Sequence, residues 1–130
     1  MWWVPRSEKN DALLLFKVLA DPTRLRLLNL LARREVCVCD LANTLSAVQP
    51  KVSRHLAHLK RAGLIDARRE GRWTHYRWAR NGNPLVRHVL QGLREWMAKE
   101  KRLTRDQYKL RKICCWNEKT KTRQTKARKD

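Results

Sequence analysis

Apolar residues recur along the first third of the chain at the spacing of amphipathic helices. Residues 8–20 follow the capping residue Ser7 and carry a broad apolar face. Asp21 can cap a second helix and Pro22 fits its first turn, so the pattern predicts a largely buried helix that ends near Arg34. The next four residues, VCVC at positions 36–39, form a short link with β propensity.

Two helices joined by a tight turn are predicted next. Asp40 is a good N-cap for a short helix over residues 41–45, and a turn over residues 46–48 leads to a longer helix over residues 49–62. The longer helix has one inward apolar stripe at positions i, i+4 and i+7: Val52, Leu56 and Leu59. Its polar and basic residues point away from this stripe. Such a pair is typical of a helix-turn-helix.

A β-hairpin is predicted directly after the helix-turn-helix. Residues 64–69 and 73–78 can form strands, and residues 70–72 can form the turn between them. Arginines lie near the tip of this hairpin, which is the layout of a winged helix. The sequence therefore predicts a mainly α fold with a small β-hairpin, a winged helix-turn-helix.

A fifth helix follows the break at residues 81–84. It carries apolar residues at near-heptad spacing: Leu85, Val89, Leu93 and Trp96. An apolar helix beyond a complete small domain needs a surface to pack against. A homodimer is the simplest source of that surface, so we expect the chain to be dimeric.

Charge indicates the kind of partner. The chain has 130 residues, with 31 Lys and Arg against 12 Asp and Glu, a net charge of +19. This surplus predicts a polyanionic partner, either nucleic acid or an acidic membrane surface. Residues 101–130 hold 12 of the basic and 3 of the acidic residues. We therefore expect an N-terminal arm (1–7), a DNA-binding and dimerisation domain (8–100) and a basic C-terminal tail (101–130), disordered over residues 117–130.

The apolar stretches are short and interrupted by charge, which argues against a membrane-spanning helix. We expect DNA, and no membrane, as the partner. The first residues lack the apolar run of a secretory signal, so we expect a cytoplasmic protein. In that compartment the four cysteines are expected to be thiols rather than structural disulfides.

Three segments resemble, in the same order, the motifs of a known family. Residues 19–28 (LADPTRLRLL), 49–56 (QPKVSRHL) and 69–77 (REGRWTHYR) are similar to the second helix, recognition helix and wing of the ArsR/SmtB metalloregulators. The resemblance covers about residues 10–97. It implies a dimeric winged-helix repressor that binds double-stranded operator DNA, and it implies that the protein is not an enzyme.

Residues 35–41 (EVCVCDL) resemble the inducer site of the arsenic-responsive branch of that family. The first two family cysteines match Cys37 and Cys39, whereas the third falls at Ala42. The resemblance implies no constitutive cofactor, and it implies As(III) or Sb(III) as the inducer. Arsenic resistance is the expected biological context.

Thiolates suit these ions because trivalent arsenic and antimony are soft. Cys37 and Cys39 supply two sulfurs, and in an extended link residues i and i+2 project to the same side. The third ligand could be Cys114 or Cys115, from the same or the partner subunit, or a small cellular thiol. Closing the ring of sulfurs should distort the helix start at Asp40, so that the recognition helix loses its docking angle and DNA is released.

Zinc fits the sequence less well. Structural zinc sites use four ligands at familiar spacings, and Cys-x-Cys is tight for that purpose. The other sensing site of the family uses Asp and His on the fifth helix, where this chain has only His88.

DNA contacts are expected from the recognition helix and the wing. The early residues of the helix are assigned to base edges, with Arg favouring guanine and Gln favouring adenine: Gln49, Lys51, Ser53 and Arg54. Later residues and the wing are assigned mainly to phosphates: Lys60, Arg61, Arg68, Arg69 and Arg72. His55 and His58 flank the apolar stripe, and His58 is included in the predicted DNA-binding set.

Three alternatives remain open at this point. A repressor of the same fold could sense oxidation or persulfides through Cys37 and Cys39. A dithiol enzyme such as an arsenate reductase is disfavoured, because no cysteine heads a phosphate-cradling loop. An architectural DNA binder without a ligand would also explain the charge.

Overall fold

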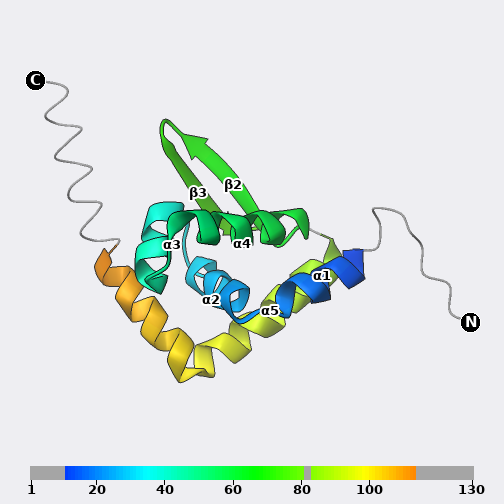
Figure 1. The fold of residues 1–130 in the computed structure, drawn as a ribbon. Coiled ribbons are helices and arrows are strands. Elements are labelled where there is room, and N and C mark those ends of the chain that lie inside the picture. Colours follow the sequence, from blue (N-terminus) through cyan, green and yellow to red (C-terminus); the bar gives the residue numbers. More distant parts are fainter. Residues whose placement is uncertain (1–10, 81–82, 114–130) are drawn as a thin grey trace, which may run out of the picture.

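The computed structural model of the chain describes residues 11–80 and 83–113, and helices make up most of it. The elements in chain order are α1 (Asp11–Leu19), α2 (Pro22–Leu31), β1 (Val36–Cys37), α3 (Val38–Leu45), α4 (Gln49–Arg61), β2 (Ile65–Glu70), β3 (Trp73–Trp78) and α5 (Pro84–Lys99) (Figure 1). A C-terminal helix over residues 101–113 follows α5. Within the described residues no helix is long and apolar enough to cross a membrane. The predicted winged helix-turn-helix fold, mainly α with a small antiparallel sheet, is confirmed.

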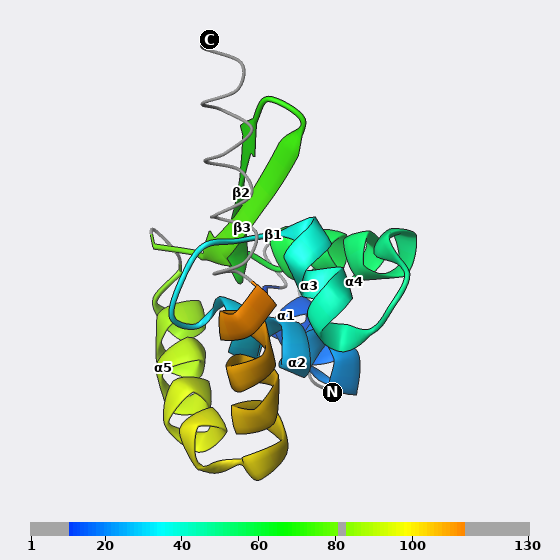
Figure 2. The same ribbon diagram turned by 90° about the vertical axis from the view of Figure 1, so that its left-hand side faces the viewer.

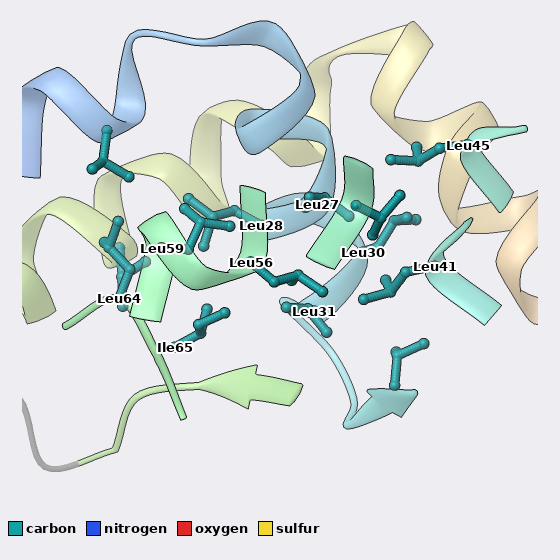
Figure 3. Close-up of a cluster of buried hydrophobic side chains, with 14 of the residues drawn as sticks. Leu27, Leu28, Leu30, Leu31, Leu41, Leu45, Leu56, Leu59, Leu64 and Ile65 are labelled. Carbon is teal, nitrogen blue, oxygen red and sulfur yellow. The ribbon is translucent and has the colours of Figure 1, made fainter. Parts of the chain in front are cut away.

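The core forms around α2, whose side chains meet those of α3, α4 and the start of β2 (Figure 3). Ten of the residues in this cluster are Leu27, Leu28, Leu30, Leu31, Leu41, Leu45, Leu56, Leu59, Leu64 and Ile65. None of these ten is more than 9% exposed. Removing this much apolar surface from water is the main force that holds the helix-turn-helix in place.

The start of α2 matches the sequence prediction. The Asp21 carboxylate accepts a hydrogen bond of 3.1 Å from the backbone N–H of Arg24, and Pro22 occupies the first turn. The helix ends at Leu31, three residues before the expected end near Arg34. The chain leaves the helix early because it must reach the sheet at Val36.

The start of α3 differs from the prediction. We expected Asp40 as the N-cap of a helix over residues 41–45, but α3 begins at Val38, with Cys37 as its N-cap and Asp40 in its first turn. The extended link over residues 36–39 is correspondingly reduced to the two residues of β1. Cys39 is therefore helical, and the expected side-by-side projection of Cys37 and Cys39 from an extended strand is wrong.

The wing is part of a three-stranded sheet in the order β1-β3-β2. The predicted hairpin pairs Ile65 with Trp78 at its base and Glu70 with Trp73 at its tip, and Gly71 turns the chain with a φ of 60°. Gly favours this left-handed conformation because it has no Cβ. The sequence did not predict that β1 would pair with β3 on the other side, which brings Cys37 opposite His75.

The C-terminal boundary of the fold also differs from the prediction. Residues 101–113 were assigned to the basic tail, but they form a helix that packs back against the domain (Figures 1 and 2). Leu103 and Leu110 are buried in the core, and the Asp106 carboxylate forms an ion pair of 2.8 Å with the Nε of Arg26 on α2. The two leucines and the polar groups between them anchor the helix to the domain. The basic composition of the segment did not predict this packing. The expected arm (1–7) and the expected disorder over residues 117–130 lie outside the described residues.

Candidate DNA interface and thiol site

Helix α4 presents a polar, basic side to solvent because its apolar stripe is entirely buried. Val52, Leu56 and Leu59 are fully buried against α2 and α3, as predicted. The outward side carries most of the predicted DNA-binding set, with five exposed and two half-buried residues: Gln49, Lys51, Arg54, Lys60 and Arg61, then Ser53 and His58. The helix ends at Arg61, followed by Ala62 and by Gly63 with a φ of 76°, as its sequence predicts.

The N-terminus of α4 suits a phosphate. Pro50 occupies the first turn, which contains no acidic residue. The free N–H groups and the helix dipole make such an end partly positive. The side chains of Gln49 and Lys51 are exposed at this same end of the helix.

His55 does not share this outward position. Its Nδ1 accepts a hydrogen bond of 3.2 Å from the Nε of Arg24 on α2, and the same guanidinium donates to the carbonyl of Val18. Burial lowers the pKa of His55 despite the opposing attraction of the nearby Asp21 carboxylate. The sequence left His55 open between packing and DNA contact, and the structure places it in the packing between α2 and α4. Arg24, which joins α1, α2 and α4, was not identified from the sequence, since His55, its partner on α4, is 31 positions away along the chain.

In the wing, Arg68 differs from the other two predicted arginines. Its Nε donates a hydrogen bond of 2.7 Å to Glu35, which precedes β1, and its Nη1 donates one of 2.9 Å to Glu70. The hydrogen bond from Arg68 also lowers the pKa of the Glu35 carboxyl below its usual value. Among the described residues, Arg69 and Arg72 are exposed and form no ion pair. They carry the uncompensated charge of the wing, whereas Arg68 fastens the wing to the segment that leads into β1.

The two candidate thiols lie where the sheet meets α3. Cys37 is the last residue of β1 and the N-cap of α3, and it is 3% exposed. Cys39 is half-buried in the first turn of α3, and its thiol donates a hydrogen bond of 3.7 Å to the side-chain oxygen of Gln49. The thiol site is therefore in direct contact with the first residue of the recognition helix.

Two sulfurs are all that the described residues bring to this site. Neither Cys37 nor Cys39 is in a disulfide, and no group of three or more His, Cys, Asp or Glu residues in the described chain could hold a metal ion. Ala42, the position of the third family cysteine, is 6% exposed and follows Cys39 by three positions on α3. Cys114 and Cys115 lie outside the described residues. His88, on α5, is exposed.

Helix α5 divides its apolar residues between two sides. Val86, Leu90 and Met97 are buried against the rest of the domain. The predicted dimer residues lie on the neighbouring face of the helix: Leu85 is 36% and Trp96 is 47% exposed, whereas Val89 and Leu93 are half-buried and pack against the core of the same subunit. Helix α1 adds two exposed apolar side chains, Leu13 and Phe16, that the sequence prediction did not assign to a partner surface.

Comparison with known proteins gives a consistent family. Residues 21–67 match the family described as "Bacterial regulatory protein, arsR family". The chain is 42% identical over 93 residues to the arsenic resistance transcriptional regulator ArsR1 of Pseudomonas putida, covering 65% of this chain and 70% of that protein. It is 55% identical over 64 residues to the arsenical resistance operon repressor of Escherichia coli, covering 48% of this chain and 55% of that protein.

Solved structures agree with the fold. The homodimeric winged helix-turn-helix DNA-binding domain Mb0332 of Mycobacterium bovis superposes with a TM-score of 0.59 at 30% identity, covering 69% of this chain and 81% of that one.

Other similar sequences include a transcriptional repressor SmtB homolog from Synechocystis and a cadmium resistance regulatory protein from Listeria innocua. Similarity alone therefore identifies a class of regulator and leaves the choice of inducer to the chemistry of the site.

Proposed function

Because this chain belongs to the ArsR family of bacterial regulatory proteins, we propose that it is a dimeric repressor that leaves its operator when a trivalent arsenical binds its thiols. The family and fold are those of transcriptional regulators and not of enzymes. The observation that carries the inducible part of the proposal is the hydrogen bond between the Cys39 thiol and Gln49.

DNA binding is assigned to the outward side of α4 and the tip of the wing. Gln49, Lys51, Ser53 and Arg54 lie near the N-terminus of α4, the part of a recognition helix that usually meets base edges. Phosphate contacts are assigned to His58, Lys60, Arg61, Arg69 and Arg72. Arg68 has a smaller share, because two carboxylates already neutralise much of its charge.

The inducer is assigned to sulfur ligands. As(III) is soft and forms pyramidal complexes with thiolates, and Cys37 and Cys39 supply two of them at the start of α3, where the helix end favours negative charge. We assign the third sulfur to Cys114 or Cys115. Sb(III) shares this chemistry and would compete for the same site.

Binding of the ion would act on DNA affinity through two groups. Bonding to the ion would remove the Cys39 thiol proton, which would leave in water with an oxygen ligand of the arsenical, so the side-chain oxygen of Gln49 would lose its donor and face a sulfur that cannot donate. Drawing Cys37 toward the same ion would strain its pairing with His75 in the wing. Both changes would disfavour the DNA-bound conformation. The ion would then bind the DNA-free conformation more tightly than the DNA-bound one, as an inducer must.

Dimerisation is assigned to the outward side of α5. The Leu85, Val89, Leu93 and Trp96 stripe leaves apolar surface exposed on a single subunit, and the similar Mycobacterium bovis domain is homodimeric. Two subunits would present two recognition helices to a pseudo-palindromic operator.

The experiment is an arsenite titration of the protein bound to its operator. Operator duplexes would first be selected from random DNA with the purified protein, and binding would be followed by fluorescence anisotropy. We expect arsenite to weaken the binding of the wild type by about tenfold to a hundredfold, the usual range of allosteric coupling. Cys39→Ser keeps a donor for Gln49 but lacks the sulfur, so it should bind DNA and ignore arsenite.

The third ligand is tested by a rescue. The Cys114→Ser/Cys115→Ser variant should lose most of the arsenite response, and adding Ala42→Cys should restore it by supplying the missing family cysteine on α3. Failure of the wild type to prefer the selected operator over a scrambled duplex would disprove the repressor function. A wild type that binds the operator, ignores saturating arsenite and responds to peroxide would instead be a thiol redox sensor.

A further inference from the structure

We infer that the C-terminal helix, residues 101–113, is a third DNA-contacting element whose last turns bind phosphates beside those held by α4. The inference rests on the proposed DNA binding and extends it to a surface outside the recognition helix and the wing.

The position follows from one contact. The Nζ of Lys109 donates a hydrogen bond of 3.0 Å to the hydroxyl of Ser46. Ser46 ends α3 and lies in the turn of the helix-turn-helix, three residues before the first residue of α4. In both views the C-terminal helix rises from the end of α5 and finishes beside α3 (Figures 1 and 2). Its last turns therefore lie beside α3 and the turn that leads into α4.

The charge of this helix is almost entirely positive. Residues 101–113 contain six Lys and Arg and a single acidic residue, Asp106. Asp106 is already bound to both Nε and Nη2 of Arg26, so it does not compensate the cations at the other end of the helix. Three exposed cations crowd the last five residues: Lys109, Arg111 and Lys112.

Cations at a helix C-terminus have an ordinary role, which is to offset the partial negative charge of the helix dipole. That charge amounts to about half an elementary charge. Three cations exceed it several-fold, and the Lys112 ammonium is held over the ring of Tyr108, 4.5 Å from its centroid. The surplus is available to an external anion.

The helix is anchored to the domain, so its cations are held in place before DNA arrives. The Asn29 side chain donates a hydrogen bond of 2.8 Å to the Leu103 carbonyl, and the Gln107 amide donates to the Asn29 carbonyl. All of these polar groups and Leu110 are buried. A flexible basic tail would have to be ordered on binding, whereas this helix avoids most of that entropic cost.

Phosphate contacts can be counted from salt dependence. The logarithm of the binding constant falls with the logarithm of salt concentration with a slope of about −0.9 for each phosphate neutralised on duplex DNA. If the three terminal cations each bind a phosphate, the slope should become shallower by about 2 to 3 for each bound subunit when they are removed. Operator preference should be kept, because phosphate contacts carry no base readout.

The test compares two triple variants of equal charge in the full chain. Lys109→Gln/Arg111→Gln/Lys112→Gln removes the cations beside the helix-turn-helix. Lys99→Gln/Lys101→Gln/Arg102→Gln removes three exposed cations where α5 meets the start of the C-terminal helix. Operator binding would be measured by fluorescence anisotropy from low to high salt, with thermal unfolding by circular dichroism as the check on folding.

We expect the first variant to show the shallower slope and to lose hydroxyl-radical protection next to the segment contacted by α4, while the control keeps a slope within about 1 of the wild type. Equal slope changes in both variants would mean that only the net charge of the protein matters. An unchanged slope in the first variant would mean that the C-terminal helix does not contact phosphates. Either result overturns the inference. If the first triple variant does not fold, Arg111→Gln/Lys112→Gln is tested in its place, because it keeps the Lys109 contact with Ser46. The slope of its salt dependence should then become shallower by about 2. A wild type without operator preference would disprove the repressor function instead.

Discussion

At the scale of single residues, the informative cases are those whose partners lie far away in the sequence. Gln49, Lys51 and Arg54 could be placed on the outside of α4 from the spacing of the buried stripe alone, and the structure exposes them. Arg24 could not be assigned, because its partner His55 lies 31 positions along the chain. Local periodicity indicates which way a side chain points, and only the packed structure shows what it meets there.

The pKa of His55 gives a prediction at this scale. Burial lowers that pKa below its ordinary value of 6.5, so between the two values the unfolded chain binds more protons than the folded protein. The free energy of unfolding is therefore not reduced by protonation of His55 above about pH 6.5, and it falls as the pH drops toward the folded-state pKa of this residue. His55→Gln keeps an acceptor for Arg24 but does not titrate.

We expect the free energy of unfolding in urea to fall less between pH 7 and pH 5 for His55→Gln than for the wild type. Ala57→Gln, which places a glutamine on the exposed side of the same helix, should keep the pH dependence of the wild type. Parallel pH profiles for His55→Gln and the wild type would show that His55 remains hydrated in the folded protein.

At the scale of elements, the sequence predicted the helix-turn-helix, the wing and a β-prone link at β1, but it missed the pairing of β1 with β3 and the C-terminal helix. Strand β1 has only two residues, too few for an alternating pattern, and its pairing with β3 is set by tertiary structure. The C-terminal helix did have a signal: Leu103, Gln107 and Leu110 follow the i, i+4, i+7 pattern of a buried stripe. The six basic residues of this segment are typical of a solvated tail as well as of a helix surface.

The prediction for this element is that the C-terminal helix unfolds together with the rest of the domain. Leu110 is fully buried, so Leu110→Ala should lower the free energy of unfolding by about 2 to 5 kcal/mol, as large-to-small core substitutions do. Arg111→Ala, the exposed neighbour, should change it by less than about 0.5 kcal/mol. Urea unfolding followed by circular dichroism measures both. A wild-type unfolding curve for Leu110→Ala would mean that the helix is not part of the cooperative unit.

At the scale of the whole molecule, α2 lies between two surfaces with different roles. The wing projects from one side, and α5 with the C-terminal helix forms the other (Figures 1 and 2). The sequence predicted an apolar α5, but it did not show which apolar residues the domain itself would cover. The structure separates the buried Val86, Leu90 and Met97 from the exposed Leu85 and Trp96.

The prediction for the assembly concerns that exposed stripe. Leu85→Lys/Trp96→Lys should convert a dimer of twice 15.5 kDa into a monomer, because two cations would oppose two others across a two-fold interface. The subunit should keep its circular dichroism spectrum, since both side chains are at least one-third exposed. Sedimentation equilibrium gives the mass, and Gln91→Lys, an exposed position on the same helix, is the control. A double variant that stays dimeric would exclude this stripe as the interface.

The shortness of β1 has a consequence for the speed of the response. In the described residues the pairing of β1 with β3 comprises only two residue pairs, Val36 with Tyr76 and Cys37 with His75. Opening so small a unit is a local fluctuation, and such motions take microseconds to seconds instead of requiring the whole domain to unfold. Amide hydrogen exchange at these two positions should accordingly be faster than in the β2–β3 ladder. In the proposed mechanism, the β1–β3 pairing could therefore open without unfolding of the domain, so this step would not have to wait for global unfolding.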